Sequence, residues 1–358
     1  MRAIIRVFFA VVLLVVDVKG FCATENNHHR IKDLYPYHWN ELLFYRNCSE
    51  VWGSTEHDFI VKVKKIYAED TDADIKKEYE VQLSLYNFLQ AYDADPSLRQ
   101  RVTLLEPRNF QVTEDRQRYY FLMDRLYPIS EGKFKPLKRV YLGCKNNNHN
   151  LTKPRPFTAQ TPNHYLSYRE VENIVTASPQ FNEKRTNIEQ FCYDLGTVLA
   201  LIHLEAKKDG FNLEVSIVKP SKNSDSYKML ILDFDKLRDL ETVFAAKDEN
   251  KIVTAILSPM SQEYYFPFPT TKGFRHFREG YLSFAENLDK KNNCSFYVPI
   301  AKKLFQEYTT FWLRDKFARM AQVEKESDKF APLSSLLKKK KEPPMHTISY
   351  RAKQLPHK

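Results

Sequence analysis

Three charged residues lie where the chain is otherwise apolar or turns sharply, and their side chains could do chemistry. Lys62 stands within residues 59–66, where apolar and basic residues alternate. Asp233 follows four apolar residues, and a carboxylate that ends a buried strand usually has a partner, either a metal ion or a structural contact. Asp209 precedes Gly210, and Asp-Gly is also a common turn sequence. An ammonium group can neutralise phosphates and a carboxylate can bind Mg²⁺, so the types of these three residues make each a candidate for binding a charged ligand.

Structural interpretations of the same types of residue are open as well. Lys62 could form the polar face of an edge strand, because Lys64 and Lys65 follow it. His203 falls on the apolar face of a predicted helix, which is typical of a histidine buried in the core. Cys192, between two aromatic residues, fits a buried free thiol. The cysteines have no zinc-binding spacing; they stand at Cys22, Cys48, Cys144, Cys192 and Cys294.

Hydrophobic periodicity predicts the elements that must hold these residues. The alternation over 59–66 predicts a strand, and residues 74–91 repeat apolar side chains at helical spacing. A second long helix is expected over 187–207. Further strands are expected at 102–105, 119–123, 213–218 and 229–234, and further helices at 271–288 and 299–323.

The order of these segments resembles the two-lobed fold of protein kinases and aminoglycoside phosphotransferases. It is more similar still to a fungal family of unknown function, some of whose members are loosely labelled zinc-finger proteins. The similarity covers roughly residues 40–290 and is carried by the order and spacing of its segments. These segments are Asn47–Trp52, Tyr120–Pro128, Leu199–His203 with Asp209, Leu230–Asp235 and Tyr264–Pro267.

The resemblance implies roles for five residues. Lys62 would bind the phosphates of ATP, and Glu80, on the following helix, would hold that lysine in place. Asp209 would accept the proton of the substrate hydroxyl, and Asp233 would bind Mg²⁺. Glu214 stands five residues after Asp209, where kinases use Asn, and would be a second metal ligand. The cofactors implied for an active protein are ATP and Mg²⁺; an inactive one would need neither.

Glycine is scarce where such a fold uses it most. The chain has 8 glycines among 358 residues, whereas average usage predicts roughly 25. Residues 45–53, which would cover the phosphates, contain one glycine, and Asp235 replaces the hinge glycine of the resembled fold. The sequence therefore predicts a pseudokinase or a divergent ATP-dependent phosphotransferase. The alternative is a non-catalytic protein–protein interaction module on the same fold, with residues 264–269 as a contact segment.

The expected fold class is α+β, in two lobes. A small β-rich N-lobe is expected over residues 36–128 and a larger, mainly helical C-lobe over 129–323. Residues 1–20 resemble a signal peptide, because Arg2 and Arg6 precede and begin an apolar run that is short for a membrane span. Residues 324–358 are predicted to be a basic disordered tail.

The net charge of +10 lies mostly at the two ends of the chain. Residues 1–20 carry a net +2 and residues 321–358 a net +5, so the region between them is nearly neutral. This distribution argues against nucleic-acid binding by the folded domain and leaves a nucleotide or a protein as the expected partner. A run of four lysines in the tail resembles a nuclear signal, but a solvated tail agrees better with secretion.

Three Asn-X-Ser/Thr triplets fit a secreted protein or one in the lumen of the secretory pathway. They begin at Asn47, Asn150 and Asn293, and a glycan on Asn47 would obstruct a nucleotide. Beyond the leader, no stretch is apolar enough to span a membrane. The alternative location is a membrane, with an uncleaved N-terminal segment as the anchor.

Overall fold

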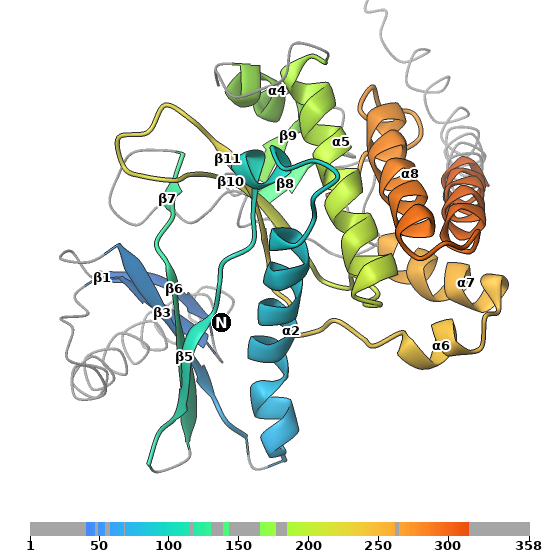
Figure 1. Ribbon diagram of the computed structural model, residues 1–358. Helices are drawn as coiled ribbons and strands as arrows, with labels where there is room; N and C mark the ends of the chain where they lie inside the picture. Colours follow the sequence, from blue (N-terminus) through green and yellow to red (C-terminus); the bar gives the residue numbers. More distant parts are fainter. Residues whose placement is uncertain are drawn as a thin grey trace, which may run out of the picture. The chain divides into compact units, whose positions relative to one another are not determined.

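The computed structural model describes residues 41–46, 49–53, 58–67, 69–114, 117–129, 139–142, 165–176, 185–261 and 265–314. The predicted signal peptide, the basic tail, Asn47 and Asn150 lie outside these residues. The chain divides into two units, residues 1–309 and 310–358. The first unit is a mixed α and β fold with a small antiparallel sheet and a helical part (Figure 1).

The small sheet has the strand order β1-β2-β3-β6-β5, and every neighbouring pair is antiparallel. Residues 45–53, the segment predicted to cover phosphates, span the end of β1 and all of β2. The predicted strands at 59–66 and 119–123 are confirmed as β3 and β6. The strands are β1 (Glu41–Arg46), β2 (Ser49–Gly53), β3 (Phe59–Lys65), β5 (Arg108–Val112) and β6 (Arg118–Asp124).

Helix α2 (Asp72–Gln90) follows β3 and begins with a capping box. The N–H of Asp74 donates to Thr71 Oγ1 at 3.2 Å, and the N–H of Thr71 donates to the Asp74 carboxylate at 3.0 Å. Buried residues recur along α2 at alternating intervals of three and four, which places them on one face. Five of the six buried residues follow this spacing and two of the five are polar: Ile75, Glu78, Gln82, Leu85 and Leu89, with Val81 as the sixth.

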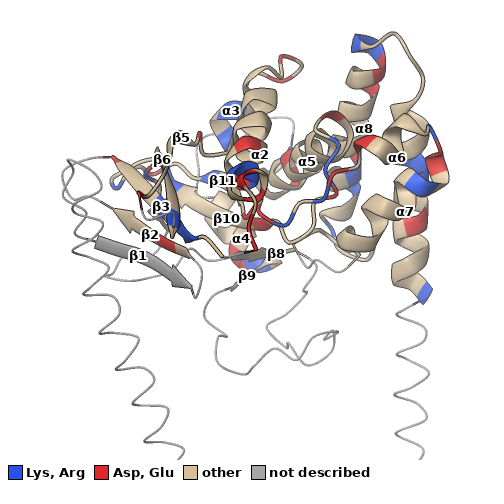
Figure 2. Ribbon diagram, turned by 90° about the horizontal axis from the view of Figure 1, so that it is seen from below, with Lys and Arg blue, Asp and Glu red and all other residues tan. Residues whose placement is uncertain are grey.

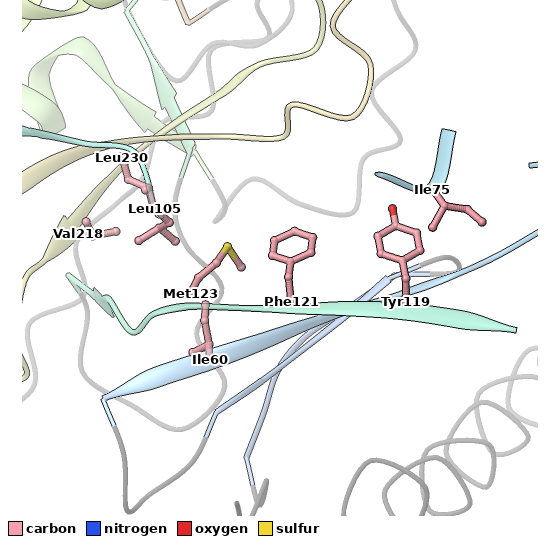
Figure 3. Close-up of a cluster of buried hydrophobic side chains, with 8 residues drawn as sticks. All are labelled: Ile60, Ile75, Leu105, Tyr119, Phe121, Met123, Val218 and Leu230. Carbon is pink, nitrogen blue, oxygen red and sulfur yellow. The ribbon is translucent and has the colours of Figure 1, made fainter. Parts of the chain in front are cut away.

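One buried apolar cluster joins α2 to both sheets (Figure 3). Tyr119, Phe121 and Met123 alternate along β6 and therefore project from the same face of the sheet. Ile75 meets them from α2, so the cluster fixes this helix against β3 and β6. Its buried members are Ile60, Ile75, Leu105, Tyr119, Phe121, Met123, Val218 and Leu230.

The second sheet has the order β4-β11-β10-β8-β9, and β7 pairs with β10 off this path. Strands β10 and β11 confirm the two strands predicted at 213–218 and 229–234. Their antiparallel register sets Glu214, at the start of β10, opposite Leu232, at the end of β11. The strands are β4 (Val102–Thr103), β7 (Tyr127–Pro128), β8 (Arg139–Tyr141), β9 (Tyr165–Ser167), β10 (Glu214–Lys219) and β11 (Lys228–Leu232).

Helices α5 (Asn187–Ala200) and α8 (Phe274–Lys291) lie side by side (Figure 1). A Cβ atom on Gly196 would lie 1.9 Å from the Phe277 carbonyl oxygen, and one on Gly280 would lie 2.0 Å from the Tyr193 carbonyl oxygen. The two helices therefore approach so closely that only glycine fits at both positions. Two of the chain's few glycines are used here.

The long helix predicted over 187–207 is confirmed, and it ends in a π-helical turn, η3 (Leu201–Glu205). Residues 297–314 are helical as well, in agreement with the prediction for 299–323 as far as the described residues extend. Four helices of the described residues were not expected from the sequence: α3 (Leu98–Arg101), α4 (Tyr168–Thr176), α6 (Glu241–Ala245) and α7 (Glu249–Met260). Helix α3 is short and precedes β4.

A buried ion pair ties α3 to α5. Arg101 Nε and Nη2 donate to the two carboxylate oxygens of Asp194 at 2.7 and 2.9 Å. Arg101 also binds Asp95 at 2.8 Å, and Gln190 donates to Asp194 at 2.8 Å. The forked guanidinium fixes both distance and orientation, so the chain leaving α2 is anchored to α5.

Candidate functional site

Strand β3 presents two lysines to the face of the sheet that α2 covers. Lys62 and Lys64 are two residues apart and project from the same side of the strand, opposite Phe121 and Tyr119 of β6. Their side chains are only 15% and 12% exposed. Figure 2 shows the basic segment of β3 in blue. Because β3 lies between β2 and β6, the interpretation of Lys62 as the polar face of an edge strand is wrong.

The carboxylate of Glu78, on α2, lies between these two lysines. Its Oε1 pairs with Lys62 Nζ, and its Oε2 lies 3.0 Å from Lys64 Nζ. The side chain of Glu78 is 2% exposed. Burial acts to raise the pKa of Glu78, but the charges of Lys62 and Lys64 hold this pKa below its usual range. Glu78 is therefore an ionised, buried group shared by two ammonium groups.

Glu78 takes the place that the sequence assigned to Glu80, which is a correction. Glu80 is exposed. It follows Glu78 by two residues, so its side chain is turned roughly 200° around the helix axis, away from the buried face. The prediction failed because the apolar spacing over residues 74–91 does not identify the polar positions of the buried face. The face that is actually buried contains Glu78 and Gln82, and polar residues do not register in a pattern of apolar spacing.

Lys64 also binds the segment that follows β11. Its Nζ lies 3.1 Å from Asp235 Oδ2. Burial acts to lower the pKa of Lys64, but Glu78 and Asp235 contribute to raising it above its ordinary value. Burial acts to raise the pKa of Asp235, and the charge of Lys64 holds it low. The residue that replaces a hinge glycine in the resembled fold is thus a counter-ion for β3.

Asp233 stands directly after β11 in a left-handed conformation, with φ of 67°. Among residues with a Cβ, Asp and Asn adopt this conformation most readily, because their short polar side chains can hydrogen-bond locally. Burial acts to lower the pKa of Lys62, but the charges of Glu78 and Asp233 raise it above its ordinary value. Asp233 therefore adds a second negative charge beside Lys62.

Asp233 and Glu214 remain the candidate metal ligands of this site. The register of β10 and β11 sets Glu214 opposite Leu232, the residue before Asp233. Within the described ranges, no group of three or more His, Cys, Asp or Glu side chains is arranged to hold a metal ion. A Mg²⁺ ion here would need phosphate and water oxygens to complete its shell.

Asp209, the predicted proton acceptor, is bound by Arg238. Its Oδ2 pairs with Arg238 Nε, and its Oδ1 accepts the N–H groups of Arg238 and Phe211, each at 3.0 Å. The side chain of Asp209 is 1% exposed, whereas that of Arg238 is 60% exposed. A general base must reach the hydroxyl that it deprotonates, and both oxygens of Asp209 are engaged within the protein instead.

Two other predictions concern buried groups, and both are confirmed. His203 is buried, and its Nδ1 lies 3.1 Å from the hydroxyl of Tyr281. Burial lowers the pKa of His203 to about 3, which keeps it neutral. Cys192 is a buried free thiol, and burial raises its pKa far above its ordinary value. Neither residue contacts the lysines of β3.

The segment proposed for contact with a protein partner lies largely in the core. Tyr265, Phe266 and Phe268 are all buried. These side chains therefore do not form a surface that a protein partner could contact. Asn293 is exposed in the turn after α8, where a glycan could be attached.

No family model matches the chain, and no curated protein matches it either. In the part of the chain that the structure describes, no helix is both long enough and apolar enough to cross a membrane. The functional proposal therefore depends on the geometry around Lys62 and on the resemblance in segment order.

Glu78→Gln should lower the free energy of unfolding by about 3–5 kcal/mol, because it leaves Lys62 and Lys64 without the buried charge they share. Glu80→Gln, two residues away and exposed, should change it by less than about 0.5 kcal/mol. Urea denaturation at neutral pH measures both. Because the pKa of Glu78 is lowered on folding, its contribution is complete above roughly pH 4.3 and is lost as the pH falls through the folded-state value. Equal losses in the two variants would contradict this assignment.

Proposed function

We propose that the chain is a kinase-like protein that binds the phosphates of ATP beside Lys62 and acts as a pseudokinase. The observation that carries this proposal is the pair of Lys62 with Glu78, between an inner strand of the small sheet and the helix that follows it. Protein kinases hold their phosphate-binding lysine with a glutamate from a helix in the same way. The order of segments, which resembles that of kinases and of the fungal family, supports a two-lobed kinase-like core.

The surroundings of Asp233 support a nucleotide with Mg²⁺ as the ligand. The negative charge of Asp233 contributes to raising the pKa of Lys62. Glu214 of β10 lies opposite Leu232 of β11, the residue before Asp233. Two carboxylates at neighbouring strand ends would offer oxygen ligands to Mg²⁺, which prefers them and retains several waters. A bound Mg²⁺ would supply the positive charge that brings phosphates close to these carboxylates.

The contacts of Asp209 favour a pseudokinase over a divergent phosphotransferase. Phosphoryl transfer needs a group that orients the attacking hydroxyl, and the Asp209 carboxylate is occupied by Arg238. Asp235 is likewise held by Lys64, where the resembled fold has a hinge glycine. Binding without transfer is the activity that these contacts permit.

Wild-type protein should bind ATP with Mg²⁺. Lys62→Met should weaken binding at least tenfold by removing a positive charge at the phosphates, and Asp233→Asn should do so by removing a carboxylate ligand of Mg²⁺. Isothermal titration gives the dissociation constants, and the ligand should also raise the melting temperature, since a ligand at 100 times its Kd stabilises by about 2.7 kcal/mol. Lys65→Met is the matched control, because Lys65 is the exposed neighbour on the same strand. It should bind as wild type does.

The outcomes separate three functions. Absence of ATP binding by wild type would overturn the proposal and favour the non-catalytic interaction module. Unchanged affinity in Lys62→Met would place any nucleotide elsewhere. Release of γ-phosphate above that of an Asp209→Asn variant would favour the divergent phosphotransferase over the pseudokinase.

We also propose that the protein works in the secretory lumen or outside the cell. The N-terminal run and the three glycosylation triplets support this, and Asn293 is exposed where a glycosyltransferase could reach it. A membrane anchored by an uncleaved leader is the alternative location.

When the full chain is expressed in a eukaryotic secretory cell, peptide N-glycosidase should increase its mobility on a gel. Asn293→Gln should remove one step of that shift, because the triplet at Asn293-Cys294-Ser295 is lost. Asn292→Gln is the control, since Asn292 is exposed next to it but begins no triplet. A wild-type protein whose mobility is insensitive to the glycosidase would contradict the assigned compartment.

A further inference from the structure

Two lysines share a single carboxylate at the centre of this site. Glu78 gives one oxygen to Lys62 and the other to Lys64, 3.0 Å away. Lys64 has a further carboxylate partner in Asp235, at 3.1 Å. Lys64 is therefore held from two sides, by α2 and by the segment after β11.

The cost of freeing Lys62 depends on this sharing. A buried carboxylate that loses its only counter-ion is strongly destabilised, because its charge stays out of water without compensation. If Lys62 were the only partner of Glu78, a phosphate that attracted Lys62 would leave Glu78 in that state. With Lys64 at its second oxygen, Glu78 keeps an opposite charge when Lys62 moves.

We propose that Lys64 is a positioning residue of the anion site, which keeps Glu78 and Asp235 paired while Lys62 turns from Glu78 to a phosphate oxygen. The phosphate is that of the nucleotide in the proposed function, on which this part of the inference rests. The sharing of Glu78 by two lysines does not rest on it. Lys64 itself does not contact the phosphate.

The first test needs no ligand. Unfolding free energies are measured for Lys62→Met, for Lys64→Met and for the double variant. Each single variant leaves Glu78 with one lysine, so the double variant should lose clearly more stability than the two single losses added together. Additive losses would overturn the inference, because they would mean that the lysines do not substitute for each other at Glu78.

The second test measures ATP affinity with Mg²⁺ by titration. Lys64→Met should weaken binding about tenfold, because Lys62 is then retained by Glu78, and Lys64→Arg should bind like wild type. Adding Glu78→Gln to Lys64→Met should recover most of the affinity, since a neutral amide holds Lys62 less strongly. A purely structural Lys64 would lower the melting temperature without this rescue.

The results distinguish the two proposals. Unchanged affinity in Lys64→Met, or no recovery in the double variant, overturns the positioning role while the nucleotide site stands. Absence of ATP binding by wild type overturns the proposed function and the phosphate part of this inference. The stability measurement then decides the sharing of Glu78 separately.

Discussion

Each ion that leaves water on folding costs several kcal/mol unless an opposite charge and hydrogen bonds replace the solvent. Around β3 this cost is offset by the carboxylate of Glu78, which pairs with Lys62 and Lys64 together. The arrangement depends on α2 lying against the face of β3 that carries both lysines. The apolar cluster of Ile75, Tyr119 and Phe121 holds the helix there (Figure 3). The apolar cluster therefore packs α2 against the sheet. The ion pairs of Glu78 join one position of α2 to Lys62 and Lys64 of β3.

The segment after β11 is fixed by charges at both of its ends. Asp235 binds Lys64 at one end, and Arg238 binds Asp209 at the other. Two further ion pairs join this segment to the loop before β10: Lys207 with Glu241 at 2.7 Å and Lys208 with Asp239 at 2.5 Å. The carboxylates of these two ion pairs are exposed, so each pair contributes little to stability. Both pairs lie close in sequence to Asp209 and Arg238, whose ion pair has a buried carboxylate. These ion pairs hold the segment after β11 against β3 and against the loop before β10.

The sequence predicts much of the framework of the site. Alternation identifies β3, helical spacing identifies α2 and α5, and an aspartate after four apolar residues identifies the end of β11. The partner of Lys62 is missed, because Glu78 and Gln82 place polar groups on a buried helix face. The contacts of Asp209 are missed as well, since Arg238 is 29 residues away and no local pattern joins the two. Ion pairs between distant segments form only when the fold brings those segments together, so the spacing of residues along the chain does not predict them.

The state of the Glu78 carboxyl tests the central claim most directly. Glutamate labelled with ¹³C at the carboxyl carbon gives one resonance for each side chain, and comparison with Glu78→Gln identifies that of Glu78. Two lysines at one buried carboxylate predict that this resonance titrates with a midpoint below roughly 4.3, the value of a free glutamate. A midpoint above that value would mean that burial dominates over the two lysines, and it would contradict the account.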